Sequence, residues 1–467
     1  MRGVVRSLLP TFLLSLTAAA AQAASLDDLV ATALRDNPQV RAAHQAWRAD
    51  RRVPDQVGAF ADPEAGVIWP LTPMADAEGQ QQATLFLSQK LPFWGKRGLR
   101  AEAAEREAAA TGETVRDVEL VVVTEVKERY YDLAYVSEAI RITEADRALV
   151  ADIVEAALAR YRAGLGQQGD VLRAQVALSR DTDRLLDLKE ERTTLEARLN
   201  RLLGRAEPSP VGDAALPQEL PVLPGIPELV AELEAGRPGL LALARQVEAS
   251  RSRLALAHKE YFPDLTARVD YGFSGEGRLP LTDGGDDGYM AMLAINLPIW
   301  RGRLHAGVAE AEDRLAAAEA AYRDERDRGR EEVVDLRFRL ATSLNQVALF
   351  DTGLVPQAEQ ALRATMEAYR TGQAGFLDLL DAERDWLELR IAAFRTKADL
   401  FQQQAQLDQV VGRLHRPDGV VAPDAPTPAL PRGGRGEADS PSLREGVGGR
   451  APGKNLLSGT TTPEAQP

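Results

Sequence analysis

The chain has no cysteine, few aromatic residues and no long apolar run beyond its first residues. The missing cysteine excludes disulfides, thiolate metal sites, thiol nucleophiles and a lipid-modified cysteine anchor. Aromatic residues make up only 5% of the 467 residues, whereas Ala, Leu, Arg and Glu are abundant. This composition is typical of long helices and coiled coils rather than of a conventional α/β enzyme. The formal net charge of −14 argues against nucleic-acid binding.

Groups that carry chemistry are also scarce. The four histidines are scattered through the chain without the spacing of a metal site. No Ser-His-Asp set, glycine-rich nucleotide loop or redox motif stands out. We therefore predict that the protein is not an enzyme and holds no cofactor and no metal.

The first residues have the pattern of an export signal. Arg2 and Arg6 precede a short apolar run at 8–20, and Ala-Gln-Ala follows at 21–23. The apolar run is too short to span a bilayer, so a retained N-terminal anchor is the less favoured alternative. We predict a signal peptide at 1–23. An exported chain without a transmembrane helix is periplasmic, secreted or inserted in the outer membrane as a barrel.

The remainder of the chain matches itself. Three segments recur in order, at offsets of 200, 206 and 208: 26–31 with 226–231, 91–94 with 297–300, and 161–164 with 369–372. One such match could arise by chance, but three in the same order indicate an internal duplication.

The duplication divides the chain into parts. We predict a first repeat at 24–207 and a second at 226–413, each with an opening helix, a β-hairpin and a long helical hairpin. The proline-rich linker at 208–225 cannot be regular helix. The Pro-, Gly- and Ser-rich tail at 414–467 has the composition of a disordered segment.

Long helices dominate both repeats. Between Phe93 and Glu207 there is no proline. The second repeat has apolar residues at alternating steps of four and three, the spacing of a coiled-coil seam: Leu304, Val308, Ala311, Leu315, Ala318 and Tyr322. A bend is expected at Pro356. Gly164 and Gly372 suit the left-handed conformation that ends a helix.

Four segments alternate between apolar and polar residues, as β-strands do. They are 65–69, 83–89, 265–273 and 289–297. Four strands cannot close a membrane barrel, so several chains must combine their strands. Two chains would give eight strands and a filled barrel, whereas three would give twelve strands and an open lumen. A small soluble sheet packed on a helix is the alternative, but the polar face with Arg268 and Asp270 suits a water-filled lumen better.

These features resemble TolC-family outer-membrane efflux proteins over nearly all of residues 24–413. The resemblance is carried by the opening at 26–40, the segment at 87–97 and the two turns at 161–172 and 369–381. Gly-Lys-Arg at 95–97 is more similar to the heavy-metal efflux branch than to the type I secretion branch. The fold implied is mainly α, with long antiparallel helical hairpins forming an α-barrel tunnel and four strands per chain in a shared 12-stranded barrel.

The resemblance also implies site residues. Asp378 and Asp381 match the aspartates that line the periplasmic gate. Latch or tip positions fall at Asp170, Tyr369, Tyr161, Gly164 and Gly372. The strand–helix junction comprises Pro92, Gly95, Lys96, Arg97, Pro298 and Trp300. The latch arginine expected five residues after Tyr369 is Ala374 here. Without the resemblance, acids in the first turn of a helix would simply favour its macrodipole.

The function implied is that of a passive exit duct in the outer membrane that extends into the periplasm. We expect a homotrimer that works with a periplasmic adaptor and an inner-membrane pump, and that exports metal cations or small toxic compounds. Two alternatives are a periplasmic coiled-coil adaptor or scaffold, and the duct of a type I secretion system. The substrate and the particular pump are not encoded in any motif of the sequence.

Overall fold

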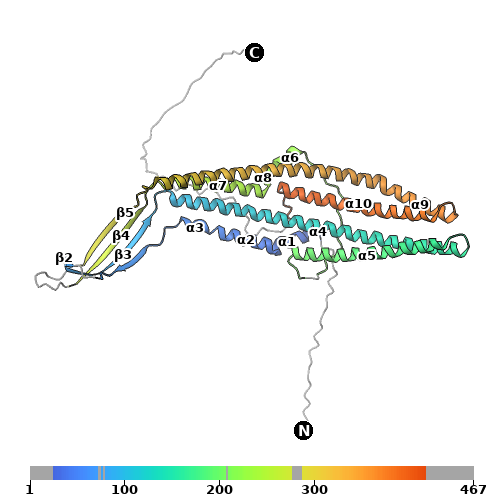
Figure 1. Ribbon diagram of the computed structural model, residues 1–467, viewed down its shortest axis with the longest axis horizontal. Coiled ribbons are helices and arrows are strands. Elements are labelled where there is room, and N and C mark those ends of the chain that lie inside the picture. Colours follow the sequence, from blue (N-terminus) through green and yellow to red (C-terminus); the bar gives the residue numbers. More distant parts are fainter. Residues whose placement is uncertain (1–24, 72–74, 77–78, 207–208, 276–286, 417–467) are drawn as a thin grey trace, which may run out of the picture. The chain divides into compact units, whose positions relative to one another are not determined.

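The computed structural model describes residues 25–71, 75–76, 79–206, 209–275 and 287–416 (Figure 1). The predicted signal peptide and nearly all of the predicted tail lie outside these residues. None of the helices in the described part of the chain is long and apolar enough to cross a membrane.

The first repeat opens with short helices, continues through strands and ends in a long helical hairpin. Its elements are α1 (Leu26–Asp36), α2 (Pro38–Asp50), α3 (Val53–Gly58), β1 (Glu64–Ile68), β2 (Ala75–Asp76), β3 (Gly79–Leu91), α4 (Lys96–Arg162) and α5 (Gln168–Leu202). Ser25 begins α1 by accepting a hydrogen bond from the backbone N–H of Asp28 at 3.2 Å. Asn37 caps α2 in the same way, and Pro38 occupies the first turn, where its missing N–H costs nothing.

The second repeat has the same order of elements. They are α6 (Ile226–Gly236), α7 (Pro238–Lys259), β4 (Leu265–Gly275), β5 (Gly288–Ile295), α8 (Arg301–Leu349), a π-helical turn η1 (Phe350–Leu354), α9 (Val355–Thr371) and α10 (Phe376–Val411). The π turn immediately precedes Pro356, where a bend was expected, because proline cannot donate the hydrogen bond that would continue an α-helix.

The strands form one antiparallel sheet in the order β1-β3-β4-β5, with the two-residue β2 paired to β3. The four predicted strands are confirmed, with ends shifted by up to four residues. The central pair, β3 and β4, joins the first repeat to the second, and Leu85 lies opposite Tyr271. The sheet therefore holds the two repeats together at one end of the helices (Figure 1).

One face of the sheet is apolar and exposed. Register places Leu87 opposite Val269, and Ala267 opposite Leu293, all on this face. Leu87, Val269 and Leu293 are each more than half exposed. The other face carries Arg268, which donates to Asp270 at 2.8 Å and lies over the ring of Phe86. The alternation predicted for β4 is thus confirmed, although Phe86, Met290 and Met292 of the neighbouring strands share the face of Arg268 and Asp270.

Helix α4 is the central element of the helical part. It packs against α5 within its own repeat and against α7 and α10 of the second repeat (Figure 1). Its buried side chains contribute to two apolar clusters, one around Val126 and Leu199 and one towards the hairpin turns around Ile153 and Trp386. By contrast, the heptad positions of α8 between Val308 and Tyr322 are only partly buried within one chain.

We predict that Gly412→Ala destabilises the protein. Gly412 ends α10 with φ +80°, and an added Cβ would collide with the carbonyl oxygen of Gly236 at the end of α6. Strain and collision together should lower the free energy of unfolding by about 2 kcal/mol or more.

The matched control is Gly307→Ala, inside α8, where an added Cβ meets no atom within 4 Å. This variant should gain up to about 1 kcal/mol from the higher helix propensity of alanine. Thermal unfolding followed by circular dichroism measures both variants. Equal midpoints for the two would contradict the role assigned to Gly412.

Candidate functional site

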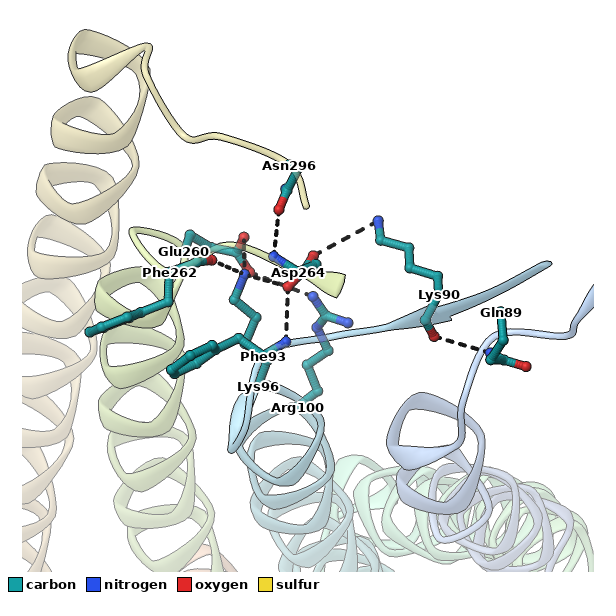
Figure 2. A network of polar contacts seen from close by, with 9 residues as sticks. All are labelled: Gln89, Lys90, Phe93, Lys96, Arg100, Glu260, Phe262, Asp264 and Asn296. Atoms are coloured by element: carbon teal, nitrogen blue, oxygen red, sulfur yellow. Dashed lines mark hydrogen bonds and ion pairs between the residues drawn. The ribbon is translucent and has the colours of Figure 1, made fainter. Parts of the chain in front are cut away.

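A buried ammonium group lies where the strands become helices. Lys96, at the start of α4, is 1% exposed. Its Nζ donates to Asp264 Oδ1 at 2.9 Å, to the carbonyl oxygen of Phe262 at 3.0 Å and to Glu260 Oε2 at 3.2 Å (Figure 2). All three acceptors belong to the second repeat. Lys96 therefore joins the two repeats at the junction.

Asp264 is the hub of this network. It accepts from the backbone N–H of Phe93 at 3.0 Å, and Lys90 Nζ lies 3.9 Å from its second oxygen. Its own N–H donates to the side chain of Asn296, which leads into the second helical hairpin (Figure 2). Burial by itself would raise the pKa of Asp264, but Lys96, the Phe93 N–H and Lys90 together hold that pKa below its usual range.

Aromatic rings flank the network. Phe93 of the first repeat stacks on Phe262 of the second, with ring centroids 4.6 Å apart. Arg97 donates to the carbonyl oxygen of Gly58 at 3.0 Å, and its guanidinium lies 3.5 Å from the ring centroid of Phe60. Gly95 has φ +88°, the left-handed conformation that turns the chain from strand into α4.

The remaining predicted junction residues do not join the Lys96 network. Pro92 directly follows the end of β3, and Pro298 lies between β5 and α8. Trp300, the residue before α8, is 75% exposed, and the equivalent Trp94 of the first repeat is 83% exposed. The junction therefore has a polar interior and exposes two indole rings.

At the other end of the helices, glycines turn both hairpins. Gly164 has φ +74° and Gly372 has φ +80°, so both have the predicted left-handed conformation. Tyr161 in the first turn is 44% exposed, whereas Tyr369 in the second is buried and packs edge-on against Phe376. Burial raises the pKa of Tyr369.

One arginine connects the two turns. Arg160, near the end of α4, donates to the carbonyl oxygen of Tyr369 at 2.6 Å. Its guanidinium also lies 4.9 Å from the centroid of the Tyr369 ring. It reaches back to the carbonyl oxygen of Leu165 in its own turn at 3.4 Å. Arg160 therefore supplies a cation between the tips, although Ala374 occupies the position where the resemblance led us to expect one.

The predicted tip acids differ in their surroundings. Asp170 lies 3.7 Å from Arg173, one turn along α5. Asp378 accepts from the backbone N–H of Gly375 at 3.0 Å and so also caps α10. Asp378 and Asp381 are both exposed and three residues apart, so they share one face of α10. The second tip thus presents two carboxylates, whereas the first has its carboxylate next to a cation.

Sequence reasoning missed the second-repeat partners of Lys96, and it missed Arg160. The sequence did contain a signal for the partners of Lys96, because Phe-Ala-Asp at 60–62 recurs as Phe-Pro-Asp at 262–264, at an offset of 202. Arg160 has no comparable signal beyond its place directly before the turn motif. Among the described residues, no group of three or more histidines or acids is arranged to hold a metal ion.

Comparison with known proteins decides the family. A family model described as outer membrane efflux protein matches residues 16–205 and 229–413, which is most of both repeats. The chain belongs to this family. Its members are efflux channels of the outer membrane rather than enzymes or periplasmic adaptors, so the adaptor alternative is excluded.

Individual members of the outer membrane efflux family are distant in sequence. The cobalt-zinc-cadmium resistance protein CzcC of Cupriavidus metallidurans is 24% identical over 71% of this chain and 77% of its own length. The outer membrane efflux protein BepC of Brucella suis is 25% identical over 67% of this chain and 68% of its own length.

Solved structures agree on the fold. The outer-membrane channel OprN superposes with a TM-score of 0.73 at 20% identity, covering 84% of this chain and 91% of that chain. CusC superposes with a TM-score of 0.72 at 18% identity, covering 83% and 92%. Long helical hairpins with a sheet at one end are thus the family fold.

We predict that Lys96→Met strongly destabilises the protein. The substitution keeps most of the length of the side chain but removes the buried ammonium that Asp264 and Glu260 share. The expected loss is about 3 kcal/mol or more of unfolding free energy.

Lys90→Met is the matched control, because the Lys90 side chain is 59% exposed and lies 3.9 Å from the same aspartate. Its expected cost is below about 1 kcal/mol. Denaturant unfolding of both variants in detergent gives the comparison, and equal losses would contradict a special role for the buried ammonium.

Proposed function

We propose that the protein is the trimeric exit duct of a tripartite efflux pump. The observation that carries the proposal is the open sheet, whose exposed apolar face suits lipid. Its edge strands, β1 and β5, have no further strand beside them within the described chain. Open edges are not tolerated in a membrane, so copies of the chain must pair edge to edge. Three copies give twelve strands and a lumen wide enough for transport.

The partly buried seam of α8 supports the same assembly. Its positions between Val308 and Tyr322 need a further surface to be covered, and the neighbouring copy supplies one. The helical hairpins would then enclose a tunnel continuous with the lumen of the barrel. Transport through this duct is passive, and an inner-membrane pump with its periplasmic adaptor supplies the energy.

The proposed substrates are metal cations or small toxic compounds. Similarity to the cobalt-zinc-cadmium resistance protein supports the first class, and similarity to the toluene efflux pump outer membrane protein TtgI of Pseudomonas putida supports the second. The acidic second tip favours cations at the mouth of the duct. In a trimer, Asp378 and Asp381 would place six carboxylates around the axis, which attract cations and repel each other.

We predict that the purified protein forms channels in planar bilayers and that Asp378→Asn/Asp381→Asn alters them. Loss of six negative charges from the trimer should lower cation selectivity and weaken block by multivalent cations at least about tenfold, because each lost carboxylate weakens cation attraction at the mouth. Single-channel recording measures both properties.

The matched control is Asp187→Asn/Glu190→Gln, two exposed acids with the same spacing on α5, away from the turns. This variant should conduct and be blocked like the parent. A gate variant with unchanged cation selectivity and block would contradict the gate. Absence of channels from a correctly folded trimer would contradict the duct itself.

Arg160 is the proposed latch between the tips. Because it binds the carbonyl oxygen and ring of Tyr369, its removal should let the second hairpin turn move away from the first. We predict that Arg160→Ala raises the frequency of channel opening by about tenfold. This corresponds to a loss of about 1.4 kcal/mol of the free energy that favours the closed state.

Arg162→Ala, an exposed arginine two residues along the same helix, is the control and should leave opening unchanged. Recordings from both variants at neutral pH give the comparison. Equal opening frequencies in Arg160→Ala and the parent would reject the latch.

A further inference from the structure

Three carboxyl groups are buried together among the helices behind the tips. Asp146 of α4 is 0% exposed, Asp181 of α5 is 7% exposed and Glu383 of α10 is 6% exposed. Their surroundings are apolar, because the cluster of Ile153, Trp386 and neighbouring side chains fills this region. The three helices come from both repeats, so the carboxyls lie where the two hairpins pack against each other.

Two of the three carboxyls have buried oxygens that no donor of the described structure reaches. Neither oxygen of Asp146, nor Oδ2 of Asp181, has a hydrogen-bond partner among the described residues. Glu383 lies near enough to Asp146 to raise its pKa, and two ionised carboxylates repel each other because they have only acceptors. A proton held between them turns this repulsive contact into a hydrogen bond.

We propose that Asp146, Asp181 and Glu383 form a buried proton-binding site that helps to hold α10 against α4, and that loss of the proton releases α10. The ligand of the site is the proton itself. Ionisation would leave like charges in an apolar seam, which separates helices instead of joining them.

Nearby arginines do not replace the proton. The charged groups that act on the three carboxyls are Arg147 of α4, Arg184 of α5, and Arg384 and Glu388 of α10. In the described structure none of these arginines forms an ion pair with any of the three carboxyls.

The protonation equilibria agree with this geometry. Burial, followed by the nearby Glu383 and Asp181, raises the pKa of Asp146 to about 9. Burial likewise raises the pKa values of Asp181 and Glu383. The folded protein therefore binds the proton more tightly than the unfolded chain does. The stability that the proton provides is fully present below the ordinary carboxyl pKa and is lost as pH rises towards about 9.

The site lies on the helix that carries the proposed gate. Glu383 follows Asp381 by two residues and is buried, whereas Asp378 and Asp381 are exposed on another face of α10. Since α10 is one continuous helix, loosening it at Glu383 moves the gate carboxylates. This part of the inference rests on the proposed function, whereas the proton site itself does not.

The test is a pH series on the parent and on Asp146→Asn, which is nearly isosteric and permanently neutral. Below its pKa, ionisation of the site increases about tenfold per pH unit. The open probability of the parent in planar bilayers should therefore rise at least about tenfold from pH 7 to pH 9. Asp146→Asn should abolish the rise, and Glu383→Gln serves as a second neutral variant. The control is Asp152→Asn, which changes an exposed acid on the same helix and should keep the rise in open probability.

Infrared spectroscopy gives a readout that needs no channel activity. The parent at pH 7 should show the carbonyl band of a protonated carboxyl, and Asp146→Asn should lose it while Asp152→Asn retains it. Absence of this band in the parent would overturn the proton site. A band without any pH-dependent opening would overturn its coupling to the gate. Failure to form channels, with the band present, would count against the duct alone.

Discussion

The described structure depends most on the hydrogen bonds of the buried Lys96 ammonium. It belongs to the first repeat, and its three acceptors belong to the second. The contact lies directly beside the β3–β4 pair, which joins the repeats within the sheet. Two duplicated halves that share a sheet need a fixed angle at the point where strands become helices. A buried charge with specific acceptors fixes such an angle better than apolar packing, because its hydrogen bonds have defined directions.

From that junction, α4 runs along both hairpins, and the residues buried against it differ between the sheet end and the tip end. Near the sheet and in the middle of the helices most of its buried positions are apolar, and the buried charges Lys96 and Glu119 have partners. Towards the tips the apolar cluster around Ile153 and Trp386 also encloses Asp146, Asp181 and Glu383, and Arg160 contacts Tyr369 between the repeats. Among the described residues, the buried carboxyl oxygens without a hydrogen-bond partner therefore lie towards the tips. In the duct proposed above, these are the groups placed to respond to pH beside the gate.

The sequence predicted the elements well because their signals are local. Alternation at 265–273 identified β4, and the lack of proline identified α4. Gly164 and Gly372 were recognised because a helix-ending turn demands positive φ. The long-range partners had no such signal. Lys96 and Asp264 are 168 residues apart, and nothing near Asp146 marks it as buried, since its burial depends on three helices from two repeats. The family resemblance implies a latch arginine at position 374, where this chain has Ala374; Arg160 on the other hairpin contacts Tyr369 instead.

The π turn at Phe350–Leu354 has a consequence for the long helix in which it lies. Before it, Val333, Leu340 and Val347 pack in the cluster with α6 and the far half of α10; after it, Ala358, Leu362 and Tyr369 pack in the cluster at the tips. A π turn contains about one residue more than an α turn, so it rotates every later side chain about the helix axis. Helices α8 and α9 thus contribute side chains to two separate apolar clusters on either side of the turn. An insertion or deletion of one residue in this turn would rotate the side chains of α9 about the helix axis and so change which of them face the cluster at the tips.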